Sequence, residues 1–307
     1  MKFIRKKFKQ THQLKMFNSL KTLNKNFMNA FTKKSKKVFF GISLLACTST
    51  PNIVNAYTPD VCKDVLGTKS ATGVYSYTAT QIQQNNVTFC TDTPDRFELV
   101  IYEMGLCTDN PLINTPIVFS KANCITSMNS SAGVTADLAG TTINLPSATS
   151  RPASNTYTYA YIVIKNTFGL KGSIKINNGA GGFAKYCSKG DGGSTPSSIN
   201  CVPLNHTEEI ESFGNNFTPD FGPENLPTGG EVSALLATPS LVRSTSEAAT
   251  ERLIGVFAAP VIITDSTQGL QVELEVTDGG YGIQFDSNSG VPIDFGSMPF
   301  KPIFTTF

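Results

Sequence analysis

The stretch that decides the fold is residues 156–165, TYTYAYIVIK, in which β-branched and aromatic side chains follow one another almost without interruption. Such residues fit the pleated surface of a sheet, and their presence at consecutive positions predicts a strand buried on both faces. Residues 169–176, GLKGSIKI, come next and are expected to pair with it as the second arm of a hairpin. The sequence therefore predicts a β-sheet at the centre of the molecule.

Two further segments extend this pattern on either side. Residues 96–106, RFELVIYEMGL, carry apolar side chains at alternate positions, which is the two-residue period of a strand. Residues 253–264, LIGVFAAPVIIT, are apolar but contain Pro260, which predicts either two strand pieces or one strand with a bulge.

The clearest hairpin signal lies near the C-terminus. Residues 269–277, GLQVELEVT, alternate between apolar and polar side chains, and the turn sequence DGG follows at 278–280. Beyond the turn, Tyr281, Ile283 and Phe285 again occupy alternate positions. We expect the two arms to pair with each other.

Residues 177–230 lose this periodicity and are rich in Gly, Ser, Asn and Pro, so we expect a long irregular loop region. Short apolar runs broken by turn residues elsewhere are typical of an all-β sandwich. The sequence therefore predicts that residues 57–307 form a single disulfide-bonded β-sandwich domain with this loop as an insertion.

Residues 1–56 have the layout of a secretory signal peptide. They contain twelve Lys or Arg residues and no Asp or Glu, followed by the apolar run 38–47 and the small-residue sequence VNA at 54–56. The basic region is long for a signal, which suggests that translation starts at Met28 or at Met16. The protein is therefore predicted to be exported to the periplasm, the outer surface or the medium.

An alternative is lipid anchoring at Cys47, because LLAC at 44–47 is similar to a lipoprotein box. An acyl chain there would tether the protein to a membrane. The apolar run itself is too short to span a bilayer, and no transmembrane segment is expected in the mature protein.

Removal of the leader reverses the charge of the chain. Twelve of the 25 Lys and Arg residues leave with it, so thirteen remain against 23 Asp and Glu, a net charge of −10. We therefore expect no nucleic-acid partner, since an acidic protein repels a polyanion.

The mature part keeps an even number of cysteines, which in an exported chain indicates disulfides. We expect sequential pairing, because each bridge would then close a loop of roughly 15 to 30 residues, worth about 3 kcal/mol. No CxxC spacing points to a metal site. The six residues are Cys62, Cys90, Cys107, Cys124, Cys187 and Cys201.

Catalytic motifs are sparse, and no catalytic residue is assigned from the sequence. His206 is the single histidine after the leader, and no GxSxG motif accompanies it. The remaining enzymatic option is a glycosidase-like hydrolase, which would need a pair of carboxylates. The acids that could form such a pair are Glu273 and Glu275 on the alternating strand and Glu208, Glu209 and Glu211 in the long loop.

A calcium ion is the one cofactor that the sequence suggests. Asp286 and Asn288 carry oxygen ligands at alternate positions, and Asp294 follows shortly after. The match to a calcium loop is incomplete, because no Glu closes a twelve-residue loop. The same pattern is also common in ordinary turns.

Three features together are similar to a loose group of exported bacterial β-sandwich proteins of unknown function. These features are EMGLCT at 103–108, the nearby Cys124, and the Tyr-rich strand with its Gly-centred continuation over 156–176. The resemblance implies an immunoglobulin- or transthyretin-like sandwich and implies no activity.

The sequence favours a non-enzymatic protein of the cell surface or periplasm that binds a protein or glycan partner or has a structural role. Rigid scaffolds that present loops are typical of binding modules. Exposed sheet edges near the C-terminus would also allow self-assembly by strand addition. The alternative is a secreted hydrolase that uses the paired carboxylates.

Overall fold

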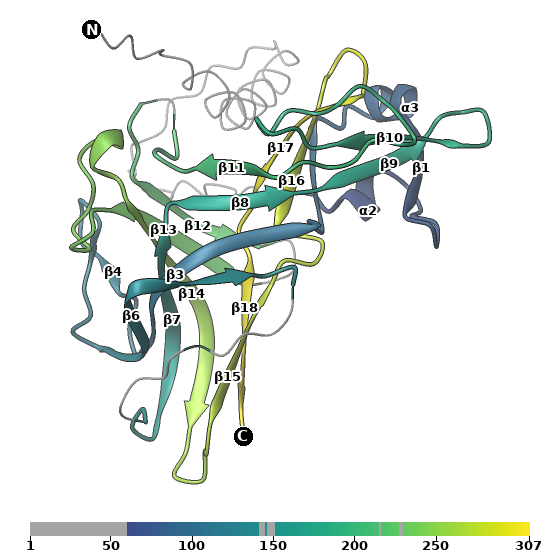
Figure 1. The fold of residues 1–307 in the computed structure, drawn as a ribbon. Coiled ribbons are helices and arrows are strands. Elements are labelled where there is room, and N and C mark those ends of the chain that lie inside the picture. Colours follow the sequence, from purple (N-terminus) through teal and green to yellow (C-terminus); the bar gives the residue numbers. More distant parts are fainter. Residues whose placement is uncertain (1–59, 141–144, 146–150, 215, 227–229) are drawn as a thin grey trace, which may run out of the picture.

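The structure is a computed structural model that describes residues 60–307, apart from residues 141–144, 146–150, 215 and 227–229 (Figure 1). The predicted leader, residues 1–56, and its Cys47 lie outside the described residues. Strands dominate the described part, which confirms the all-β class. Its helices are short: α2 (Cys62–Val65), α3 (Ala79–Gln84) and the 3-10 helix η1 (Glu247–Ala249).

The largest sheet has eight strands, and every neighbouring pair in it is antiparallel. β7 and β8 lie end to end along one side of β3, and β6 lies along the other side. The strands are β3 (Arg96–Cys107), β6 (Cys124–Asp137), β7 (Asn155–Lys165), β8 (Thr167–Lys171), β11 (His206–Glu209), β12 (Asp220–Asn225), β13 (Glu231–Ala237) and β14 (Arg252–Ile263).

Four smaller sheets surround it. One has the order β1 (Val74–Thr78), β9 (Ser173–Asn177) and β10 (Phe183–Cys187), and another has the order β17 (Pro292–Ser297), β16 (Tyr281–Phe285) and β2 (Phe89–Asp92). The two pairs are β15 (Leu270–Glu275) with β18 (Lys301–Thr306), and β4 (Leu112–Ile113) with β5 (Val118–Phe119).

β7 is buried on both faces, as its sequence predicts. Ile162 and Ile164 point into the main core, whereas Tyr161 and Val163 belong to a second apolar cluster on the opposite face. β14 pairs with β7 along its length, and the register shift between Ala258 and Val261 confirms the bulge expected at Pro260. The two adjacent apolar strands thus form the centre of the sheet.

The hairpin expected between residues 156–165 and 169–176 is wrong. β7 continues through Asn166 into β8 without reversing, so both strands run antiparallel to β3. The buried Asn166 amide donates to the carbonyls of Ile210 (3.2 Å) and Thr250 (3.3 Å), which holds this continuation in place. Beyond β8, the chain enters another sheet as β9 and pairs with β1 and β10.

The pairing predicted for the C-terminal hairpin is also wrong, although the predicted alternation of side chains along its strands is correct. β15 pairs with β18, and β16 pairs with β17 and β2. Between β15 and β16, the amides of Gly279 and Gly280 both donate to the Val276 carbonyl, while the Val276 side chain is buried in the core. This local turn directs the two strands into different sheets instead of bringing them together.

Residues 177–230 are not one irregular loop. They contain β10, which pairs with the preceding strand β9, β11, which pairs with the more distant β8, and β12, which pairs with the following strand β13. These strands are only four to six residues long, which is too short for a clear two-residue period.

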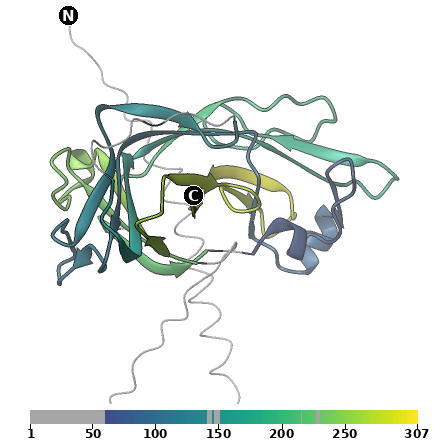
Figure 2. The ribbon, with the colours of Figure 1, turned by 90° about the horizontal axis from the view of Figure 1, so that it is seen from below.

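Figure 2 shows the eight-stranded sheet curling around the C-terminal part of the chain. One cluster of buried side chains includes Tyr75 of β1, Phe97 of β3, Leu236 of β13 and Tyr281 of β16, so the sheets share an apolar core. Burial of such side chains stabilises the fold by roughly 1.5 to 3 kcal/mol each.

Candidate functional site

Three disulfides are formed, between Cys62 and Cys90, Cys107 and Cys124, and Cys187 and Cys201. This is the sequential pairing that the sequence predicts. The first joins α2 to β2, and the second joins facing residues of β3 and β6. The third closes the segment that follows β10.

This third bridge fixes a loop with exposed apolar side chains. Three large apolar side chains lie within six residues of one another and are exposed. These are Ile199 (63%), Val202 (72%) and Leu204 (54%). The Lys185 ammonium donates to the carbonyl of Cys201 (2.9 Å), and the amide of Ser198 donates to the carbonyl of Lys185 (3.0 Å). The loop is therefore tied to β10 by a covalent bond and by hydrogen bonds.

We name this apolar loop, residues 196–204, the β10 loop. Large apolar side chains scattered singly on a surface are ordinary, but a group of them on a restrained loop is typical of an interaction site. A restrained loop loses little conformational entropy when a partner binds, which favours affinity. The disulfide and the loop region were predicted from the sequence, but these exposed side chains were not.

The carboxylates considered for a hydrolase are not brought together. Glu273 and Glu275 lie on β15, in the lower part of Figure 1, whereas Glu208 and Glu209 lie on β11 in the upper part. The Glu208 carboxylate accepts a hydrogen bond from the backbone amide of Ser297 on β17. The fold therefore does not bring the acids of β15 and β11 into one site.

His206 begins β11 and is only 5% exposed, so it is not a solvated loop residue. Its ring centroid lies 6.2 Å from that of Tyr281, and burial lowers the pKa of His206. Among the described residues neither ring nitrogen has a well-formed hydrogen bond, although the backbone near Leu204 and Phe295 favours the protonated ring. The lowered pKa therefore favours the neutral ring of His206 at neutral pH.

Glu208 lies two residues further along β11, on the same face as His206, which places the two side chains roughly 7 Å apart. Burial raises the pKa of Glu208, and the charge of Asp294 adds to this rise. Burial also raises the pKa of Tyr281 well above its usual value. The Ser297 hydroxyl and amide both lie beside the Glu208 carboxyl, so the group joins β11 to β17.

Two other buried acids are fully paired. Asp92 accepts hydrogen bonds from Lys69 (2.9 Å), the Tyr75 hydroxyl (2.8 Å) and the Thr93 amide (2.8 Å). Desolvation and the Asp92 charge both raise the pKa of Tyr75. These contacts satisfy a buried charge inside the protein, which indicates a structural role.

Glu103 on β3 is the second of these acids. It accepts hydrogen bonds from Lys121 (2.9 Å), the Tyr161 hydroxyl (2.5 Å) and Thr126 (3.3 Å). Burial and the bond to Glu103 raise the pKa of Tyr161. The only sequence signal for this network is an acid within the apolar strand RFELVIYEMGL, and no site was predicted there.

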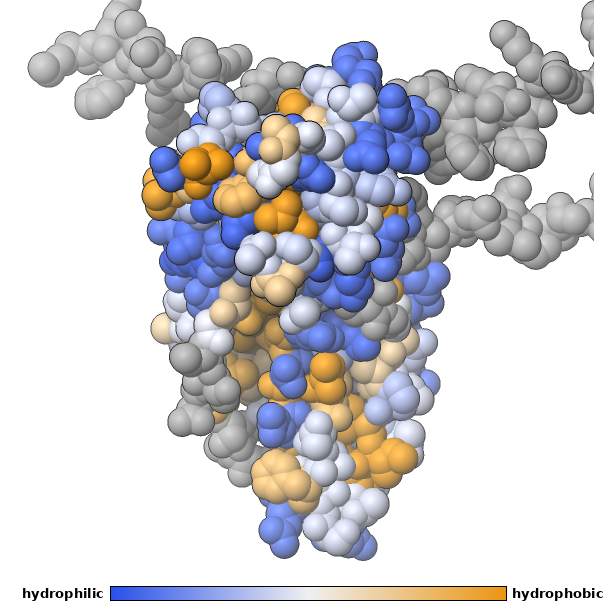
Figure 3. All heavy atoms as spheres, turned by 90° about the vertical axis from the view of Figure 1, so that its right-hand side faces the viewer, coloured by the Kyte–Doolittle hydropathy of each residue, from blue (hydrophilic) through white to orange (hydrophobic). Residues whose placement is uncertain are grey.

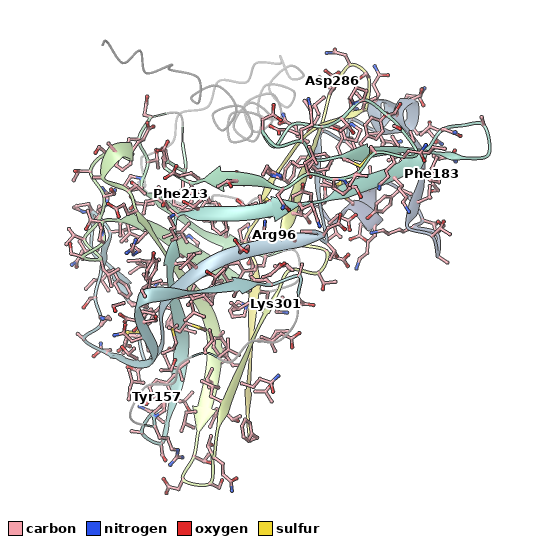
Figure 4. All side chains as sticks on the ribbon, in the orientation of Figure 1. Arg96, Tyr157, Phe183, Phe213, Asp286 and Lys301 are labelled. Carbon is pink, nitrogen blue, oxygen red and sulfur yellow. A yellow bond between two sulfur atoms is a disulfide. The ribbon has the colours of Figure 1, made fainter. Side chains whose placement is uncertain are left out.

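The residues considered for calcium lie in a turn and in the strand after it. The Asp286 carboxylate accepts hydrogen bonds from the amides of Asn288 (2.8 Å) and Ser289 (2.9 Å), so it stabilises its own turn at the tip of the β16–β17 connection (Figure 4). Asp294 lies within β17, opposite Gln284. A calcium ion at these residues stays a prediction.

No helix in the described part of the chain is long and apolar enough to cross a membrane. Comparison of the chain with protein-family profiles, with curated proteins and with solved structures finds no match.

Proposed function

We propose that this chain is an exported, non-enzymatic protein of the cell surface or periplasm that binds a partner through the β10 loop. The observation that carries the proposal is the exposure of Ile199, Val202 and Leu204 on a segment closed by the Cys187–Cys201 bridge. Three disulfides are compatible with an oxidising compartment, which supports the proposed export.

The chemistry of the β10 loop favours a protein over a glycan. Its exposed side chains are aliphatic, and such side chains gain most from contact with another apolar surface. Sugar rings are commonly bound by aromatic platforms, and the chain contains no Trp. The partner we propose is therefore a protein with an apolar pocket. We also propose that the fold is an immunoglobulin- or transthyretin-like sandwich, as the resemblance of the sequence implies.

The test measures saturable binding of the labelled, oxidised protein to cells of the source organism that lack its gene. We expect Val202→Asp to weaken binding by at least about tenfold, because a charge would enter an apolar contact. Val242→Asp is the matched control, since Val242 is 61% exposed in a different loop. Equal binding by both variants would refute the role of the β10 loop.

Export itself has a separate test. N-terminal sequencing and intact mass of the protein from whole cells would fix the cleavage site, detect a lipid on Cys47 and count oxidised cysteines. Retention in the cytosol with reduced thiols would refute the proposed localisation.

A further inference from the structure

The sheet formed by β1, β9 and β10 has one face in the core and one face that carries lysines. Lys175 on β9 and Lys185 on β10 are directly opposite each other in the antiparallel ladder, so their side chains lie on the same face. The neighbouring positions Ile174, Ile176 and Tyr186 point the other way and are buried in the core. The two lysines therefore lie on the outer face of this sheet.

The β10 loop is anchored on this outer face. Cys187 lies two residues after Lys185 on β10, so the two-residue period of a strand places both side chains on one face. The bridge from Cys187 to Cys201 then holds the loop over that face, and the Lys185 ammonium donates to the Cys201 carbonyl (2.9 Å). The loop and the lysines thus share one surface.

A third lysine lies at the end of the loop. Lys189 follows β10 and is exposed, and the carbonyl of the residue before it, Ser188, accepts a hydrogen bond from the amide of Leu204 (2.9 Å). This contact places Lys189 beside the last residue of the β10 loop. We name the three residues that border the loop, Lys175, Lys185 and Lys189, the lysine strip.

No acid in the described part of the chain neutralises the lysine strip. β1, β9 and β10 contain no Asp or Glu, and none of the three lysines forms an ion pair with a described residue. The ammonium groups of Lys175 and Lys185 donate to the carbonyls of Thr72 (3.0 Å) and Cys201 (2.9 Å). A carbonyl satisfies a donor but does not cancel its charge, and like charges directly opposite each other on two strands are unfavourable. Acidic groups of a partner would relieve this repulsion.

The lysine strip has the opposite sign to the mature chain as a whole. Residues 171–207 contain four Lys and one Asp, whereas residues 57–307 have a net charge of −10. The single acid, Asp191, lies in the turn after Lys189 and accepts a hydrogen bond from the amide of Gly193 (3.1 Å). An acidic partner is therefore attracted at this surface and repelled over most of the remaining surface.

Apolar and charged groups are available on the same side of the molecule. Figure 3 shows the right-hand side of Figure 1, and apolar and hydrophilic side chains lie next to each other in its upper half, the half that holds β9 and β10 in Figure 1. Protein interfaces commonly combine an apolar centre with a polar rim. The β10 loop and the lysine strip have this arrangement.

We propose that the partner of the β10 loop is a protein with acidic residues around its apolar pocket, and that these residues pair with the lysine strip. The inference rests on the proposed function and adds the charge of the partner to it. Rim charges mainly set the orientation and the rate of association, whereas the buried centre contributes most of the binding free energy. The lysine strip therefore selects among proteins that have a suitable apolar pocket.

The length of the lysine strip favours a protein over an extended polyanion. β9 and β10 have five residues each, which corresponds to roughly 17 Å of strand. A long acidic polysaccharide or nucleic acid would continue beyond this length onto acidic surface, where it would be repelled. A protein can place its acids on the lysine strip and its apolar pocket over Val202 at the same time.

The experiment measures binding of the labelled, oxidised protein to cells that lack its gene, in about 0.1 M and about 1 M NaCl, where the Debye length is about 10 Å and about 3 Å. Lys189→Glu is the test variant, because the Lys189 side chain is exposed and forms no hydrogen bond in the described part. We expect it to weaken binding by about fivefold at the lower salt concentration and by less than about twofold at the higher one. Val202→Asp should weaken binding at both, since salt does not screen an apolar contact.

Lys165→Glu is the matched control, because Lys165 is exposed at the end of β7 and is separated from β9 by the length of β8. It makes the same change in net charge and should bind as the wild type does. Equal binding by Lys165→Glu and Lys189→Glu would overturn the proposal, and so would a loss for Lys189→Glu that persists at the higher salt concentration. If Val202→Asp still weakens binding in either case, the proposed function stands and only this inference fails.

Protease treatment of the cells tests the class of partner. Loss of binding after the treatment supports a protein. Binding that survives the treatment and is displaced by heparin would show that the lysine strip pairs with an acidic polysaccharide, which would overturn the proposal.

Discussion

Buried acids are accommodated in two different ways in this molecule. Glu103, between β3 and the neighbouring strands, is paired with Lys121 and receives hydroxyl hydrogen bonds from Tyr161 and Thr126. Glu208, where β11 meets β17, receives the amide of Ser297, and no Lys or Arg in the described residues forms an ion pair with it.

The difference shows what each region does for the fold. A buried charge with a full set of partners is costly to disrupt, because removal of one member leaves the others unsatisfied. A partly buried carboxylate without a cation instead has its pKa raised, so its ionised form opposes folding at neutral pH. We expect the Glu103 network to stabilise the sheet and the Glu208 region to limit stability.

The largest expected effect comes from Glu103→Ala. The substitution removes the Glu103 acceptor and leaves the buried Tyr161 hydroxyl with only Thr126 (3.1 Å) as a partner, and we expect a loss of about 2 kcal/mol in the free energy of unfolding. Urea denaturation of the oxidised protein measures this change. Glu273→Ala on β15 is the control, because Glu273 is exposed, and it should change stability by less than about 0.5 kcal/mol. Similar losses for both variants would contradict the assignment.

Glu208→Gln should raise the free energy of unfolding, whereas Glu103→Ala lowers it, and the change should be smaller. Since the folded-state pKa of Glu208 is raised, its contribution to stability is complete below the unfolded-state pKa and is lost as pH rises through the folded-state pKa. At pH 7 the substitution replaces a carboxyl whose ionisation burial disfavours, while it keeps an acceptor for Ser297. We expect a gain of about 1 kcal/mol, which is roughly 2 to 4 °C in the melting temperature.

The pH profile distinguishes this explanation from a simple packing effect. The advantage of Glu208→Gln should disappear below about pH 4, where the wild-type carboxyl is protonated in both states. A gain that is constant between pH 4 and pH 8 would show that charge is not its cause.

His206→Leu tests the neutral histidine beside Glu208. The folded-state pKa of His206 is lowered, so the wild type loses stability as pH falls through the unfolded-state value of about 6.5 towards the folded-state value. The variant should lose less stability over that interval. Melting temperatures at pH 7.5 and pH 5 measure the effect, and equal slopes for both proteins would contradict a buried neutral histidine.

Tyr281→Phe should have the smallest effect. The Tyr281 hydroxyl is buried without a well-formed hydrogen bond in the described part, although Ser188 lies nearby, and its ring stacks on Phe295 at 5.4 Å. Removal of the hydroxyl keeps the stacking, so we expect a change within about 0.5 kcal/mol or a small gain. A loss above about 1.5 kcal/mol would show that the hydroxyl is satisfied. Tyr161→Phe, which removes the hydrogen bond from the Tyr161 hydroxyl to Glu103, is the comparison variant for the same stability measurement.

Much of the local structure follows from the sequence. The strand at residues 156–165 and the bulge at Pro260 are present because β-branched runs and proline act through local sterics. The disulfides join consecutive cysteines along the chain, since short loops close at a small entropic cost.

The pairing of strands does not follow from the sequence in the same way. Alternation in GLQVELEVT fixes which side chains of β15 face the core. It does not distinguish between β16 and β18 as the partner strand, because the backbone of either can pair with β15, and the structure pairs it with β18. The buried positions of His206 and Glu208 depend on β17 closing over β11, which is a contact across about 90 residues of sequence. A single sequence contains no local signal for such a contact.

The amino-acid sequence by itself determined the long apolar strands, the charge of each part and the cysteine pairs, because these depend on neighbours along the chain. Only the tertiary structure decided which strands became edges, which acids lost their water and which apolar side chains stayed exposed. The physical reason is that burial and strand pairing are properties of residues far apart in sequence, and they are fixed when the curled sheet and its smaller partners pack together.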